Sequence, residues 1–232
     1  MRILFSNFQH MNTNLIAEQF IREILKDESL TLRNYNYMDL LNEIVSKRVE
    51  QEIPKEHVKQ FLIPEFYDSN KTPLNDVYIE SIFNYILDHL EERNNMYKVL
   101  LYFYPFINHE KEKVEENFFN ILRFITQSHR LEINRENVRS CLFNYISFCS
   151  WGVTYAIRTK IPPSYDLSNS FSALINGPYC ENKLNDFLDR LMNELTGGRE
   201  ENIIDLKMFK RMFKKYDISS IERVREYLLT EK

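Results

Sequence analysis

Glycine is scarce in this chain, and that scarcity restricts the folds and sites open to it more than any other feature. Only 4 of the 232 residues are glycine, whereas an average usage of about 7% would supply about 16. Collagen, glycine-rich linkers and the GxGxxG and P-loop phosphate sites all need more glycine, so they are excluded. Aromatic residues are plentiful instead, with 17 Phe and 14 Tyr. Such a chain normally forms long helices and packs bulky side chains between them.

Length and charge are those of an ordinary globular protein. A chain of 232 residues with 44% hydrophobic and 28% charged residues is not disordered and builds a core without disulfides or metal. Lys and Arg number 30 against 34 Asp and Glu, and the net charge of −4 argues against a nucleic-acid coat. The three cysteines form no CxxC and the first residues do not read as a signal sequence, so we expect free thiols and a cytoplasmic protein.

Apolar residues at helical spacing predict several amphipathic helices. A glycine pair, Gly197-Gly198, is expected to stop the fourth of them. The predicted helices cover residues 15–25, 77–90, 114–125 and 184–195, and two more cover residues 201–232 on either side of Asp217.

Other segments predict β-strands. The strongest is residues 97–107 (YKVLLYFYPFI), a continuous β-prone run typical of a central strand that is covered on both faces and ends at Pro105. Residues 141–151 are consistent with either a buried strand or a buried helix. The remaining predicted strands are residues 3–5, 30–37 and 171–176.

Strands that alternate with helices predict an α/β fold, because parallel strands need helical crossovers. We expect a parallel sheet of about five strands with helices on both faces. Residues 1–180 would form this domain, and residues 181–232 a C-terminal helical extension packed on it. The sequence shows no internal repeat.

The loop after the first predicted strand has the chemistry of an anion site. Ser6 and the run Asn12, Thr13 and Asn14 supply hydroxyl and amide groups directly before a helix. A helix start carries free N–H groups and partial positive charge, which suit a phosphate. A plain capping loop is the alternative.

The order of these segments resembles the flavodoxin-like fold, in its NAD(P)H-dependent quinone reductase and azoreductase branch. The resemblance covers about residues 1–180 and is carried by RILF, SNFQHMNTN and LIAEQFIREIL, by the strand end PFIN, and by SWG after CLFNYISFC. It implies a homodimer that binds FMN and passes a hydride from NAD(P)H to a quinone-like or small aromatic acceptor. The implied flavin-binding residues are Ser6, Asn12, Thr13 and Asn14 at the phosphate, and Pro105, Phe106, Ile107, Asn108, Ser150, Trp151 and Gly152 at the ring.

Two departures from that family keep alternatives open. One glycine, Gly152, stands where the family has a pair, and Trp151 is large enough to fill the space of the ring. Charged residues 109–113 follow Asn108, where the family is usually apolar. The alternatives are a cofactor-free interaction or regulatory protein on this fold, and an all-helical module, such as a viral host-interaction protein, in which VLLYFYPFI is a buried helix.

The remaining reactive residues form no metal site and no recognised nucleophile. The five histidines lack metal spacing, although His10 and His109 would meet if their strands were neighbours. Cys149 has no visible base and is expected to be a buried thiol. The basic run 207–215 (KMFKRMFKK) predicts a docked helix, with a membrane or nucleic-acid patch as the alternative. We expect no metal, nucleic acid or membrane partner.

Overall fold

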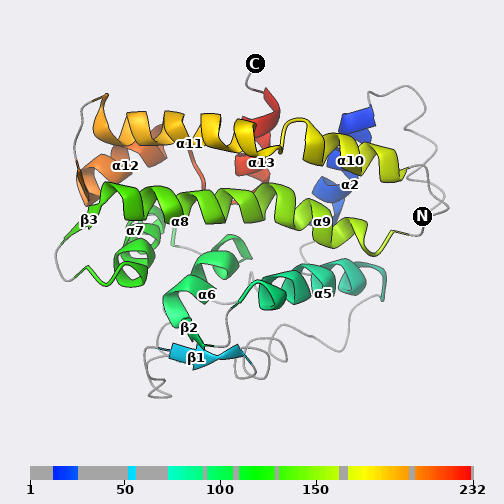
Figure 1. Ribbon diagram of the computed structural model, residues 1–232, viewed down its shortest axis with the longest axis horizontal. Coiled ribbons are helices and arrows are strands. Elements are labelled where there is room, and N and C mark those ends of the chain that lie inside the picture. The colour runs from blue at the N-terminus through cyan, green and yellow to red at the C-terminus, as the bar shows by residue number, and fades with distance from the viewer. Residues whose placement is uncertain are drawn as a thin grey trace.

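The computed structural model describes residues 13–25, 52–55, 73–90, 93–106, 110–128, 131–161, 167–198 and 202–230. Helices dominate these residues, and the strands among them form two short antiparallel ribbons (Figure 1). No helix in these ranges is long and apolar enough to cross a membrane. The strands predicted at residues 3–5 and 30–37 lie outside the described residues.

The predicted α/β flavodoxin-like fold is wrong, because the described residues contain no parallel pair of strands. The segment expected to be the central strand is helix α6 (Met96–Phe103), followed by the 3-10 turn η2 (Tyr104–Phe106). Residues 171–176, also expected to be a strand, lie in helix α10 (Leu167–Asn176).

Burial explains why the sequence of α6 has the hydrophobic pattern of a strand. Its apolar side chains cover most of its circumference, with Val99, Leu100, Leu101 and Phe103 each at most 2% exposed and Lys98 partly buried on the remaining side. A helix apolar on most sides has nearly the same continuous hydrophobic pattern as a central strand. The side chain of Asn95 accepts from Tyr97 N at 2.9 Å and so favours a helix start. The all-helical alternative is correct for this segment.

The amphipathic helices are confirmed. Helix α11 ends at the glycine pair as expected: Gly197 has φ 64° and its N–H donates to Asn193 O, a left-handed cap that glycine forms without strain. The helices predicted from periodicity are α2 (Thr13–Leu25), α5 (Pro73–Asp88), α7 (Val114–Ile125), α11 (Glu181–Thr196), α12 (Leu206–Lys215) and α13 (Ile221–Thr230).

The ambiguous segment 141–151 is helical and belongs to a long rod. Helix α8 (Arg135–Ser147) continues through a π-helical turn, η3 (Phe148–Gly152), into α9 (Val153–Arg158). Figure 1 shows this rod crossing the molecule beneath α11 and α10. Helix α11 packs on α8, α5 and α10 pack on α9, and α13 packs on η3, so the rod is the central element.

Short ribbons join the helices in pairs. Strand β1 (Glu52–Pro54) pairs with β2 (Arg93–Asn95), and β3 (Glu132–Asn134) pairs with β4 (Ile203–Asp205). At the centre of the second ribbon Ile133 faces Ile204, and both are buried. Strands β2, β3 and β4 each lead directly into a helix.

The second ribbon joins two units of the same design. Nine residues, 126–134 and 197–205, separate α7 from α8 and α11 from α12. The last strand residue caps the following helix in both: Asn134 accepts from Glu136 N at 2.9 Å, and Asp205 accepts from Met208 N at 2.7 Å. Counted with the first three residues of the second helix, each connection has the twelve residues of an EF-hand loop, so the second ribbon joins an EF-hand-like pair.

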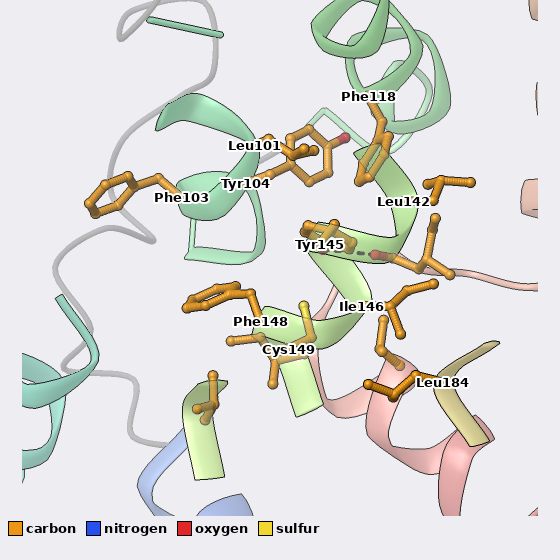
Figure 2. Close-up of a cluster of buried hydrophobic side chains, with 14 of the residues drawn as sticks. Leu101, Phe103, Tyr104, Phe118, Leu142, Tyr145, Ile146, Phe148, Cys149 and Leu184 are labelled. Atoms are coloured by element: carbon orange, nitrogen blue, oxygen red, sulfur yellow. Dashed lines mark hydrogen bonds between the residues drawn. The ribbon is translucent and has the colours of Figure 1, made fainter. Parts of the chain in front are cut away.

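Aromatic side chains fill the core between these helices (Figure 2). Phe118 of α7 meets Tyr104 and Tyr145 edge-on, with ring centroids 4.7 and 5.1 Å apart. The buried Tyr145 hydroxyl donates to Ile218 O at 2.8 Å, which ties the rod to the segment before α13. The abundance of Phe and Tyr noted in the sequence is therefore a property of the core.

Candidate functional site

A pocket of about 540 Å³ opens where the rod meets the turn between α10 and α11. Its volume is within the range of small-molecule sites. The rod supplies one wall and the α10–α11 segment the other. The lining residues are Phe143, Ser147, Trp151, Ile175, Asn176, Tyr179, Cys180, Glu181 and Leu184.

Trp151, the only tryptophan of the chain, is one wall of this pocket. Its ring stacks on Tyr155 with centroids 5.3 Å apart and planes 9° apart, and Tyr155 is 44% exposed. Tyr85 of α5 meets Trp151 at 6.1 Å and stacks on His89 at 3.9 Å. These four rings form an aromatic row that runs from the pocket to the surface.

The polar groups of the pocket are few, and the carboxylate of Glu181 is the one that only accepts hydrogen bonds. The Ser147 hydroxyl oxygen is buried and has no hydrogen-bond partner among the residues that the structure describes. Glu181, the first residue of α11, and Asn176 both line the pocket. No Lys, Arg or His belongs to the lining. The pocket is therefore mainly apolar and aromatic, with one carboxylate at its edge.

A buried arginine behind the pocket fixes the π-helical turn. Arg225 of α13 is 0% exposed, and its Nη1 donates to Cys149 O at 3.1 Å, Ser150 O at 2.9 Å and Thr154 Oγ1 at 3.0 Å. A π turn interrupts the regular i→i+4 ladder, and buried carbonyls in it need other donors. Arg225 supplies them.

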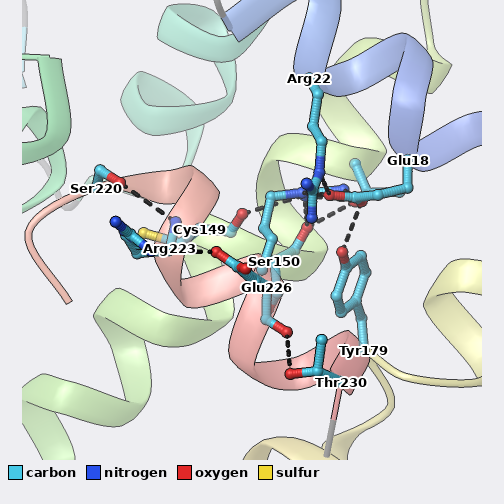
Figure 3. A network of polar contacts seen from close by, with 11 residues as sticks. Glu18, Arg22, Cys149, Ser150, Tyr179, Ser220, Arg223, Glu226 and Thr230 are labelled. Carbon is cyan, nitrogen blue, oxygen red and sulfur yellow. Dashed lines mark hydrogen bonds and ion pairs between the residues drawn. The ribbon is translucent and has the colours of Figure 1, made fainter. Parts of the chain in front are cut away.

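The same arginine pairs with a buried carboxylate from the other end of the chain. Arg225 Nη2 lies 2.6 Å from Glu18 Oε2, and Glu18 also accepts from Tyr179 Oη at 2.7 Å and from Arg22 Nε at 3.2 Å. Figure 3 shows Glu18, Arg22 and Tyr179 converging beside Ser150. Tyr179 thus belongs both to this network and to the pocket wall.

The charges in the network follow from its geometry. Burial on its own raises the pKa of Glu18, but the neighbouring Arg225 and the hydrogen bonds to the carboxylate outweigh burial, so the pKa of Glu18 lies below its ordinary value. Burial raises the pKa of Tyr179, and the adjacent carboxylate raises it further. Glu18 is therefore ionised and Tyr179 is a neutral donor at neutral pH.

The cysteines are free, and two of them are poor nucleophiles. Cys149 is fully buried, and burial raises the pKa of its thiol far above the ordinary value. Burial raises the pKa of Cys141 to about 11. Because the thiolate is the reactive form, neither residue is primed for attack at neutral pH.

The residues proposed for FMN fall in three separate elements. Thr13 and Asn14 begin α2, Pro105 and Phe106 lie in η2, and the third set lies in η3. The other four, Ser6, Asn12, Ile107 and Asn108, lie outside the described residues, as do His10 and His109.

Within η3 only Trp151 lines the pocket. Ser150 is buried and donates to Ile146 O at 2.7 Å. Gly152 is close to Tyr85, because a Cβ at this position would lie 2.7 Å from the Tyr85 ring. Phe106 is 3% exposed and packs on Phe148. The close approach at this glycine is to a tyrosine of the core, not to an open ring site.

Sequence reasoning missed Glu18, Arg225 and Tyr179. Two signals were available: Glu18 lies on the face of α2 that carries Ala17 and Ile21, and Arg225 directly follows Val224. A charge on an apolar face predicts a buried ion pair, because an unpaired buried charge is too costly. Which two charges meet is not visible in the sequence.

The EF-hand-like loops do not fit calcium. Such a loop binds through acidic or carbonyl groups at its first, third, fifth and ninth positions, a bidentate Glu at the twelfth, and needs a sixth-position glycine. Arginine occupies the fifth position of the first loop (Arg130) and the third of the second (Arg199). The twelfth residues are Asn137 and Met208, and Asn134 and Asp205 are engaged as helix caps.

The basic run 207–215 is a docked helix in the structure. Arg211 of α12 donates to Leu195 O at 2.6 Å and so satisfies the end of α11. Lys215 pairs with Glu194 at 2.8 Å, and Lys210 with Glu116 at 3.6 Å. The apolar side, Phe209, Met212 and Phe213, is buried.

No family model, no curated protein and no solved structure matches this chain.

Proposed function

We propose that this chain is a cofactor-free binding protein rather than an oxidoreductase. The observation that carries the proposal is the pocket at Trp151, which is wide enough for a small molecule and is lined by apolar and aromatic side chains. Its lining holds one thiol, Cys180, and no histidine or lysine that could act as its base.

The structure of the scaffold supports the same proposal. The resemblance that suggested FMN and NAD(P)H depended on a parallel sheet, which the described residues do not form. FMN binding and the homodimer remain predictions without that support. The EF-hand-like loops lack a calcium ligand set, so the proposed binding is independent of calcium. Three free thiols are consistent with a reducing compartment, and a cytoplasmic location is part of the proposal.

A neutral apolar dye and one blocking substitution test the proposal. N-phenyl-1-naphthylamine, which fluoresces in apolar surroundings, should bind the native chain, and Ser147→Phe should abolish the signal by filling the pocket. Asn144→Phe adds the same ring to the exposed side of α8 and should leave binding intact. FMN titration should give no bound flavin absorbance.

Two results contradict the proposal. Dye binding that survives Ser147→Phe places the apolar site elsewhere. A yellow protein, or FMN that binds and is reduced by NAD(P)H, restores the oxidoreductase interpretation. Equal melting temperatures of the two Phe variants serve as the control for folding.

A further inference from the structure

We propose that the pocket at Trp151 takes a small organic cation, an ammonium or guanidinium group carried on an aryl or alkyl body. This inference rests on the proposed function, because it assigns the chemistry of the ligand to that same pocket. Charge, aromatic walls and size each support it.

The charge of the lining favours a cation. Glu181 contributes the single formal charge, and its carboxylate forms no ion pair within the described ranges. The Asn176 amide oxygen is a further acceptor in the lining. A ligand N–H group supplies the donors that these oxygens need. An anion would meet Glu181 with no lining cation to offset it.

The aromatic walls favour the same charge. The partly exposed rings of Trp151 and Phe143 line the pocket, and the faces of such rings attract cations. Tyr179 already makes a cation–π contact within the protein, because the Arg225 guanidinium carbon lies 4.7 Å from its ring centroid. One face of Trp151 is covered by Tyr155, which makes the indole a fixed wall.

The N-terminus of α11 does not reverse this preference. A helix start favours negative charge, and Glu181 provides that charge in the first turn. The apolar remainder of the lining, including Ile175 and Leu184, suits a hydrocarbon body. A volume of about 540 Å³ accommodates a phenyl ring with a short chain.

Three probes that share one body test the charge. They are 2-phenylethylammonium, the neutral 2-phenylethanol and the anionic 3-phenylpropionate. Trp151 fluorescence at low salt measures each affinity, since no other tryptophan contributes. We expect the ammonium to bind about threefold to tenfold more tightly than the alcohol, and the carboxylate to bind most weakly. Added salt should reduce the difference.

A matched pair of charge removals on α11 identifies the carboxylate. Glu181→Gln should bring the ammonium close to the affinity of the alcohol and leave the alcohol unchanged. Asp186→Asn removes the same charge from an exposed position of the same helix outside the lining and should change neither affinity. Thermal unfolding of both variants confirms that they fold.

The outcomes separate this inference from the proposed function. If the alcohol binds as tightly as the ammonium, or Asp186→Asn acts as strongly as Glu181→Gln, the pocket binds ligands but the cation preference is wrong. If the carboxylate binds most tightly, the sign is reversed and the inference fails. If none of the three probes nor the neutral dye binds a folded chain, the proposed function fails as well.

Discussion

Arg225 is the residue through which segments far apart in the chain contact one another. Its guanidinium bonds to Glu18 of α2, to two carbonyls of η3 and to Thr154 of α9. Removing one partner of a buried ion pair leaves the other charge uncompensated, and that loss is larger than the net value of the intact pair. Substitutions in this network therefore test whether α2 and α13 stabilise the π turn.

Replacing Arg225 tests this role. We expect Arg225→Met to lower the free energy of unfolding by about 3–5 kcal/mol, because it removes the fully buried cation paired with Glu18 and a donor to the η3 carbonyls. Urea unfolding followed by circular dichroism measures the loss. The exposed Arg223→Met, two residues away on the same helix, should cost less than about 1 kcal/mol. Equal losses of unfolding free energy in both variants would show that the buried network stabilises the chain no more than an exposed ion pair does.

The lowered pKa of Glu18 predicts an acid dependence of stability. The unfolded chain has the higher Glu pKa, about 4.3, and therefore binds more protons in this range. The contribution of Glu18 is full above that value and is lost as the pH falls through the lower folded-state value.

Glu18→Gln should remove this part of the dependence. The difference in unfolding free energy between the native chain and the variant should be constant above about pH 5 and should shrink as the pH falls below about 4.3. Denaturant curves at a series of pH values measure it. A difference that grows towards acid pH would mean that the folded-state pKa of Glu18 is raised.

At the scale of the element, helix caps order both EF-hand-like units at the point where each strand meets the next helix. Asn134 and Asp205 each end a strand and bond to backbone N–H groups of the next helix. These are the positions at which a helix otherwise has unsatisfied donors. A cap thus replaces part of the ordering that a bound ion gives to such loops.

Substitution of Asp205 measures that contribution. Asp205→Ala should destabilise the chain by about 1 kcal/mol, since it leaves Met208 N without its acceptor, and Asp205→Asn should retain most of the stability. Thermal or urea unfolding of the two variants makes the comparison. Equal loss in both would point to the charge of Asp205 rather than to its cap.

The helices with a clear polar face could be predicted from the sequence, and the largely buried helix α6 could not. The spacing in α7 and α11 sets a clear period, and Gly197 marks the end of α11. Residues 96–103 carry a single charged side chain, Lys98, which is too little to set a helical period, so their β-propensity led to the wrong prediction of a strand. That error, together with residues 171–176, produced the parallel sheet and the flavin site built on it.

At the scale of the whole molecule, the repeated unit was also hidden from the sequence. The two EF-hand-like units share spacing, a buried isoleucine pair and a capping residue, but they share no run of identical residues. The two units share a backbone geometry, which is determined by the isoleucine and the capping residue of each connection. Of the pocket, only Trp151 was singled out beforehand, and its other walls come together only through the folding of α10 and α11 against the rod.

The loop composition predicts indifference to calcium. With about 1 mM Ca²⁺ or with a chelator, we expect the same melting temperature to within about 1 °C, because an ion that does not bind the folded state cannot stabilise it. Differential scanning calorimetry makes the comparison, with Mg²⁺ as the ionic-strength control. A rise specific to Ca²⁺ would show that a loop binds the ion despite its arginine.

The indole N–H resonance of Trp151 gives the most direct test of the account, since a chain with one tryptophan shows one such signal. In a ¹H–¹⁵N correlation spectrum, 2-phenylethylammonium should move this signal in a saturable way, and FMN should leave it in place. A signal that FMN shifts and the ammonium does not would contradict the account at its centre, because the pocket would then be a flavin site.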